Sequence, residues 1–106
     1  MPKIVEISVD QRYFEYIVNG QKTIEGRINK GKFSDLQIGD CLFINQSVFR
    51  IVKDIKKFEN FQQLLCFYGI KNIVPNAEKI TDAVAIYHQF YTPQQELEFG
   101  VLGIFI

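Results

Sequence analysis

The sequence predicts one α+β domain spanning residues 1–106, in which five or six strands form a small curled sheet or barrel with three or four helices packed around it. The predicted strands come mostly first, the predicted helices follow, and one strand closes the chain, an order unlike alternating strand–helix units. A chain of 106 residues suits one domain and leaves no room for two. Hydrophobic residues make up 47% of it, enough for a real core.

The first elements are a strand over residues 3–9 and a helix over about 11–19. The strand alternates apolar and polar residues, which predicts one buried face. Asp10 precedes the helix and is a good N-cap residue. Gly20 ends the helix, since glycine readily adopts the left-handed conformation found just past helix ends.

The strand expected over 22–28 has one strongly polar face. Thr23, Glu25 and Arg27 alternate there with apolar residues or glycine, and Lys22 stands at the start. Because side chains two apart in a strand share a face, these polar groups project side by side. Such a row can bind an anionic or hydrogen-bonding ligand.

The middle of the chain predicts a loop followed by a hairpin. Residues 29–39 are rich in Gly and Lys, and a Gly-Asp turn precedes a strand over 40–46. Asn45 and the two residues after it form a turn into a longer strand over about 48–57. We expect these two strands to pair in an antiparallel hairpin.

The second half predicts three helices and a final strand. Asn60 begins the first helix and Pro75 opens the second, while Thr92 begins the third with the threonine, proline and glutamine of a strong N-terminal signal. His88, the only histidine, is expected to face solvent. The ending over 101–106 has nearly no polar residue, which predicts a buried central strand.

The formal net charge is zero, but it is unevenly distributed. Residues 1–57 hold ten Lys/Arg and seven Asp/Glu, a balance of +3, so residues 58–106 carry −3. A neutral total argues against long, non-specific tracking along nucleic acid and leaves room for a pocket that binds one nucleotide or a short strand.

Several functional classes are not supported by the sequence. No apolar run approaches the length of a membrane span, and Glu6 interrupts any signal-peptide segment, so we expect a cytoplasmic protein without membrane contact. Cys41 and Cys66 lack metal-ligand spacing and are expected to be reduced core residues. We expect no metal and no cofactor, and no serine-hydrolase triad or phosphate-binding loop is apparent.

The segment NGQKTIEGRINKGKFSDLQIGDCLFIN resembles the signature of the ASCH domain, a relative of the PUA domain. The signature has a helix, then G-x-K-x-x-E-x-R, then a loop to a Gly-Asp turn and a hydrophobic strand. Gly20, Lys22, Glu25 and Arg27 occupy its four marked positions. The second half is similar to the helical half and closing strand of the family, so the resemblance covers nearly the whole chain.

The resemblance implies a PUA-like β-barrel with a cleft beside the K-x-x-E-x-R strand, and a function in binding RNA or nucleotides. Some relatives are small amidohydrolases that remove the acyl group from N4-acylcytidine, with a lysine, a threonine and a distant glutamate. Lys22 matches the lysine and Glu25 stands at the threonine position, whereas Thr23 follows Lys22 directly. Asn76 lies near the place expected for the glutamate.

The candidate ligand-binding residues are Lys22, Thr23, Glu25, Arg27, Asn45 and Tyr91. Arg27 offers a planar fork that suits phosphate or a base edge, and Glu25 can fix that fork or accept from an exocyclic amine. Tyr91 can stack on a base. The alternatives are an exposed ion pair between Glu25 and Arg27, a turn role for Asn45, and core packing for the aromatic residues.

Three functions are compatible with this pattern. The first is a module that binds RNA or a nucleotide in the cleft. The second is a small hydrolase of a modified nucleoside or of RNA, with Lys22 and Glu25 as catalytic acid or base. The third is a protein-interaction module whose cleft has no ligand.

Overall fold

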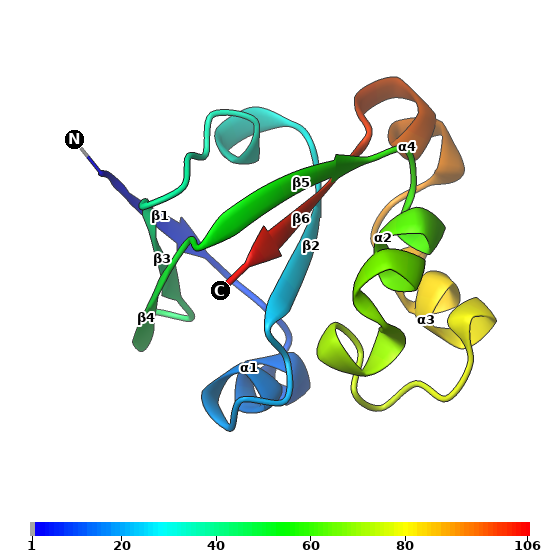
Figure 1. Cartoon of the computed structure of the whole chain (residues 1–106), viewed down its shortest axis with the longest axis horizontal. Helices are drawn as coiled ribbons and strands as arrows, with labels where there is room; N and C mark the ends of the chain where they lie inside the picture. The colour runs from blue at the N-terminus through cyan, green and yellow to red at the C-terminus, as the bar shows by residue number, and fades with distance from the viewer. Residues whose placement is uncertain (1) are drawn as a thin grey trace.

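The computed structural model describes residues 2–106, which form six strands and four α-helices (Figure 1). This composition confirms the predicted α+β class. Two short 3-10 turns lie at Gly31–Phe33 and Ile70–Asn72. In chain order the elements are β1 (Ile4–Ile7), α1 (Gln11–Val18), β2 (Ile24–Ile28), β3 (Cys41–Ile44), β4 (Val48–Ile51), β5 (Asp54–Phe58), α2 (Phe61–Tyr68), α3 (Ile80–Tyr87), α4 (Pro93–Phe99) and β6 (Val101–Phe105).

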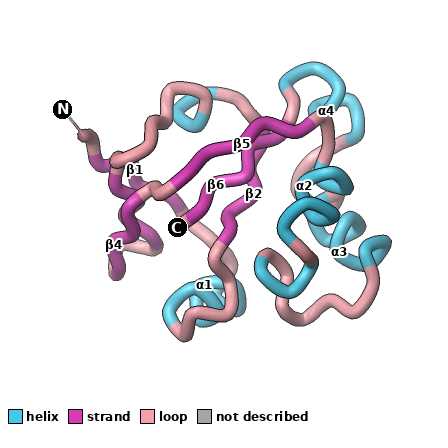
Figure 2. The backbone as a smooth tube through the Cα atoms, in the orientation of Figure 1, coloured by secondary structure: helices cyan, strands magenta, loops and turns pink. Residues whose placement is uncertain are grey.

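The strands form two three-stranded sheets. One has the order β1–β3–β4, with β1 parallel to β3 and β3 antiparallel to β4; the other has the order β2–β6–β5 and is antiparallel throughout. The two sheets do not close into a continuous hydrogen-bonded barrel, so the PUA-like arrangement is partly open. Helices α2, α3 and α4 gather on one side of the strands (Figure 2).

The single long strand predicted over 48–57 is wrong, because the chain changes sheets in the middle of it. Val52 is fully buried between β4 and β5, and its N–H donates to the Asp40 carbonyl. The next N–H, that of Lys53, donates to the carbonyl of Phe105 in the other sheet. The hairpin prediction therefore holds for β3 and β4 only, and β5 pairs with β6.

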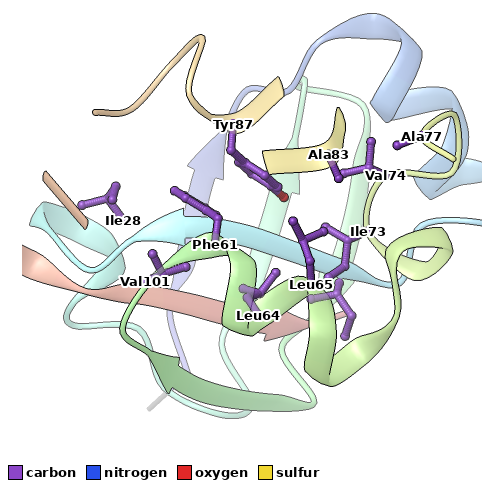
Figure 3. Packing of buried hydrophobic residues seen from close by; sticks show 11 residues of the cluster. Ile28, Phe61, Leu64, Leu65, Ile73, Val74, Ala77, Ala83, Tyr87 and Val101 are labelled. Atoms are coloured by element: carbon purple, nitrogen blue, oxygen red, sulfur yellow. The ribbon is translucent and has the colours of Figure 1, made fainter. Parts of the chain in front are cut away.

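Two hydrophobic clusters cover the two faces of the β2–β6–β5 sheet. One fills the space between the sheets and includes Leu42, Val52 and Ile104. The other lies under α2 and α3 and is centred on Phe61 and Leu64 (Figure 3). Because both faces are covered, the middle strand β6 is apolar along nearly its whole length, as predicted for a buried central strand.

The helix starts follow their predicted signals in three of four cases. Asp10, Asn60 and Thr92 each accept a backbone N–H at the start of their helices, and Thr92 completes a capping box with Gln95. The helix predicted to open at Pro75 instead begins at Ile80, without a side-chain cap.

The two cysteines are free. Both were predicted to lie in the core, and this prediction agrees with the position of Cys41 only. Cys41 is partly buried, whereas Cys66 is exposed. The apolar stripe of α2 points Phe61, Leu64 and Leu65 into the core, and this orientation turns Cys66 outward.

Candidate functional site

A pocket of about 360 Å³ lies beside β2, at the edge of the β2–β6–β5 sheet that has no partner strand. It is lined from three directions. The segment from β1 to α1 contributes Ser8, Asp10 and Tyr13, and the region from α2 to α4 contributes aromatic residues that include Tyr87 and Tyr91. The third wall is the signature strand itself, with Lys22, Glu25, Gly26 and Arg27.

The register of β2 against β6 explains which backbone groups face this pocket. The Thr23 carbonyl accepts from Ile106 and the Asn29 N–H donates to Gly100, so the odd-numbered residues of the strand bond to β6. The backbone of Gly26 therefore points away from β6, toward the free edge. The Gly26 N–H has a hydrogen-bond partner at that edge, because it donates to Glu25 Oε1 at 3.1 Å.

Lys22 is buried immediately before β2, with 4% of its surface exposed. Its Nζ donates to the carbonyls of Ile24 at 2.7 Å and Ile73 at 2.9 Å, and lies 3.7 Å from Glu25 Oε1. Burial lowers the pKa of this amine below its ordinary value, and the Glu25 carboxylate opposes that shift. The two carbonyl bonds tie the segment before α3 to the start of β2.

Glu25 is the anionic centre of the site. One carboxylate oxygen accepts from the Gly26 N–H, and the other accepts from Arg27 Nη2 at 3.3 Å. Burial alone would raise the pKa of this carboxyl, but the positive charges of Lys22 and Arg27 outweigh it and hold the pKa below the usual range. Glu25 is therefore ionised at neutral pH and separates two cations that would otherwise repel.

Arg27 lies between the ion pair and the pocket. Its Nη2 also donates to the Ser8 carbonyl at 2.8 Å, and its guanidinium lies 4.9 Å from the centre of the Phe33 ring. Burial lowers its pKa, but Glu25 more than compensates, so the pKa of Arg27 is raised and the charge is permanent. The Nη1 and Nε groups have no hydrogen-bond partner among residues 2–106, which leaves N–H donors available to a ligand.

The structure brings together four of the six predicted ligand-binding residues. Lys22, Glu25, Arg27 and Tyr91 all line the pocket. The Glu25–Arg27 pair is buried, with side chains 6% and 17% exposed, so the alternative of a solvent-exposed ion pair does not hold. The Tyr91 ring also stacks on the Phe61 ring, with 5.4 Å between the two ring centroids, and Tyr91 lines the pocket as well.

The other two predicted residues lie outside the pocket lining. Thr23 precedes β2, and its backbone bonds to Asn72 and Ile106. Asn45 uses its side chain to clamp the chain at Val9: its Oδ1 accepts from the Val9 N–H at 2.8 Å and its Nδ2 donates to the Val9 carbonyl at 3.0 Å. Asn76 lies near the pocket without lining it, where its Oδ1 accepts from the Tyr13 hydroxyl at 3.3 Å.

Several lining residues were not predicted from the sequence. Ser8, Asp10 and Tyr13 reach the pocket because the connection from β1 to α1 and the first turn of α1 border it, which no local pattern indicates. Tyr87, the last residue of α3, is one of the aromatic residues for which the sequence left core packing as the alternative role. The Tyr87 ring does pack in the core: its centroid lies 4.1 Å from that of the Phe61 ring, and the two rings are nearly parallel. Tyr87 lines the pocket as well.

A second hollow of about 460 Å³ lies between β5 and α4, and it contains none of the signature residues. Among residues 2–106 there is no group of three or more His, Cys, Asp or Glu side chains arranged to hold a metal ion. Within the same residues, no helix has the length and apolar character needed to span a membrane.

The chain belongs to the ASCH domain family, whose model matches residues 7–102. It is similar to the crystal structure of the archaeal hypothetical protein PH0355, with a TM-score of 0.93, 32% identity, and coverage of 97% of this chain and 95% of that one. It is also similar to the solution structure of protein PF0455 from Pyrococcus furiosus, with a TM-score of 0.82, 26% identity, and coverage of 95% and 93%. No curated protein matches the chain significantly.

Proposed function

We propose that this chain is a binding module for a nucleotide or a short RNA, with the ligand in the pocket beside β2. The observation that carries the proposal is the hydrogen bonding of the Arg27 guanidinium. Its guanidinium is fixed by Glu25 and Ser8, yet it keeps unpaired N–H donors at a pocket bordered by tyrosine rings. A fixed guanidinium beside aromatic faces suits a ligand that combines a planar ring with oxygen acceptors.

The charge of the site supports the same proposal. Lys22 and Arg27 contribute two positive charges and Glu25 one negative charge, which sums to +1 in a largely buried setting. A single net positive charge favours one phosphate group or the acceptor atoms of a base over a long polyanion. This fits the formal net charge of zero for the whole chain.

In this proposal Lys22 positions the site and does not contact the ligand directly. Its ammonium group is already bonded to two carbonyls and lies next to Glu25. Lys22 thereby keeps Glu25 ionised, and Glu25 in turn orients the Arg27 guanidinium. Arg27 is the residue expected to contribute most of the polar binding energy.

The proposal is tested by calorimetric titration of mononucleotides and short single-stranded RNAs at two salt concentrations. We expect saturable binding that weakens as salt rises, because phosphate contacts release counterions. Arg27→Lys should weaken binding roughly tenfold or more, since lysine cannot reproduce the planar fork. Arg50→Lys, an arginine on β4 outside the pocket, is the matched control. Absence of binding by all of these ligands would refute the proposal.

One observation favours a second candidate, the amidohydrolase function. Lys22 is buried with a lowered pKa beside an ionised carboxylate, which is the environment of a lysine that takes up a proton during hydrolysis. In that reaction Lys22 or Glu25 would accept a proton from the attacking water as its oxygen bonds to the acyl carbon, and would return that proton to the cytidine nitrogen as the C–N bond breaks. Incubation with acylated cytidines, followed by chromatography, tests this. Formation of cytidine that Lys22→Met abolishes supports it, and absence of product removes it.

A further inference from the structure

The aromatic wall of the pocket beside β2, formed by Tyr87 and Tyr91, rests on one buried ring. Both tyrosines line the pocket, and both stack on Phe61, which is fully buried behind them. The Phe61 ring centroid lies 4.1 Å from that of Tyr87, at an interplanar angle of 9° (Figure 3). It lies 5.4 Å from that of Tyr91, at an angle of 19°. The position of the two tyrosine rings therefore depends on where Phe61 is held.

A glutamate on α4 holds Phe61 by its backbone. Phe61 is the first residue of α2, so its N–H is one of the donors that no residue within the helix can satisfy. Glu96 accepts this N–H with its Oε2 at 2.8 Å, and only 7% of Glu96 is exposed. Glu96 thus fixes the start of α2, and with it the ring on which the aromatic wall rests.

The other oxygen of the same carboxyl group reaches the segment that carries the wall. Glu96 Oε1 lies 2.7 Å from Nε2 of His88, the residue that follows Tyr87 directly. The Tyr87 carbonyl accepts from the Tyr91 N–H at 3.0 Å, so the two tyrosines are joined through the turn after α3. One side chain therefore connects the ring behind the aromatic wall with the backbone from which the wall projects.

We infer that Glu96 and His88 are positioning residues of the pocket, because they hold the rings of the aromatic wall in the arrangement that stacks on a planar group of the ligand. Neither is among the described residues that line the pocket. This inference rests on the proposed nucleotide-binding function and extends it to two residues that do not contact the ligand. Since stacking acts on the base alone, loss of either residue should weaken binding of the base and spare the contact of a phosphate with Arg27.

Four variants test the inference. His88→Ala removes one contact at an exposed position, and Glu96→Ala removes both contacts. Glu96→Gln is the conservative variant, because its amide oxygen can accept from the Phe61 N–H and its amide nitrogen can donate to the imidazole. Glu98→Ala, at an exposed glutamate two residues further along α4, is the matched control. If Glu96→Ala does not fold, His88→Ala provides the same test alone.

The first measurement needs no ligand. The NMR chemical shifts of the ring protons of Tyr87 and Tyr91 report on their stacking with Phe61. We expect these shifts to change in the two alanine variants of the Glu96–His88 contact, and to stay as in the wild type in Glu96→Gln and in the control. Ring shifts that are unchanged in His88→Ala would overturn the inference.

The second measurement compares the ribonucleoside 5′-monophosphates with ribose 5-phosphate, which carries the same phosphate and no base, by NMR titration. His88→Ala and Glu96→Ala should weaken nucleotide binding at least about fivefold, the lower end of what stacking of a base contributes, and leave the affinity for ribose 5-phosphate unchanged. An equal loss for both kinds of ligand would indicate a merely structural role and overturn the inference while nucleotide binding stands. Absence of binding by every nucleotide in the wild type would refute the proposed function, and the ring shifts alone would then decide the positioning role.

Discussion

Gly26 leaves the space that the Tyr87 ring occupies. A Cβ atom on Gly26 would lie 2.7 Å from the Tyr87 hydroxyl oxygen and 3.1 Å from the ring carbon that carries it, so the glycine allows the last residue of α3 to pack flat against β2. Gly103 stands directly opposite on β6, and there the space is filled by Tyr68, Phe58 and Leu64. The paired glycines thus let α2 and α3 approach the sheet closely.

Gly26→Ala should destabilise the fold by about 1–3 kcal/mol, because the added methyl group displaces Tyr87 from its stack with Phe61. Urea denaturation followed by circular dichroism measures this change. The double variant with Tyr87→Phe should cost less than the sum of the two single variants, since the nearest clashing atom is gone. Strict additivity would show that the two positions do not interact.

Glu25→Gln should be among the most destabilising changes of a single charge. It leaves the Lys22 ammonium and the Arg27 guanidinium buried without their shared counterion, and breaking a buried ion pair costs about 3–5 kcal/mol. Glu98→Gln, an exposed position on α4, is the control and should change stability by less than about 0.5 kcal/mol. Comparable effects of the two variants in chemical denaturation would contradict the central role of Glu25.

The same carboxylate predicts how stability depends on acid. The pKa of Glu25 in the folded chain lies below its ordinary value of 4.5, so its contribution is fully present above pH 4.5 and is lost as pH falls through the folded pKa. The difference in unfolding free energy between wild type and Glu25→Gln should therefore be constant above pH 5 and shrink below about pH 4.5. A difference that is independent of pH from 3 to 7 would rule this out.

Asn45 should prove to be a structural residue. Its side chain makes two hydrogen bonds to the Val9 backbone, and its φ of 51° lies in the left-handed region required by the turn between β3 and β4. Asn45→Gly keeps that conformation and removes only the two bonds, so a loss of about 1–3 kcal/mol is expected. Nucleotide affinity should stay unchanged, and a tenfold loss of affinity at unchanged stability would restore Asn45 as a ligand contact.

Local signals in the sequence were sufficient to predict the strands and helices that have a capping residue or a clear apolar pattern of their own. The Thr92 capping box, the Asp10 and Asn60 caps and the apolar β6 all match the structure, because each depends on residues a few positions apart. The signature residues were also placed on β2 or directly before it. Their burial depends on contacts with distant segments, such as that of Lys22 with the Ile73 carbonyl and that of Arg27 with the Ser8 carbonyl, which a two-residue period cannot reveal.

The features that sequence reasoning missed depend on contacts between distant segments. The change of sheet at Val52 is set by Asp40 and Phe105, and neither is near it in the chain. His88 is exposed, as expected, but its Nε2 also lies 2.7 Å from Glu96 Oε1, a contact that no local pattern indicates. The other oxygen of Glu96 accepts from the Phe61 N–H at the start of α2 at 2.8 Å. Glu96 on α4 thus connects the end of α3 with the start of α2, and no local sequence pattern predicts these two hydrogen bonds.

The middle position of β6 in its sheet has a consequence for biosynthesis. Strands β2 and β5 have no ladder of their own until residues 101–105 insert between them. A nascent chain that has emerged only as far as α4 therefore exposes two unpaired strand edges next to the half-built pocket. Residues 101–105 must therefore be present before the site exists, so we expect a chain truncated after Gly100 to be captured by chaperones and to bind no nucleotide.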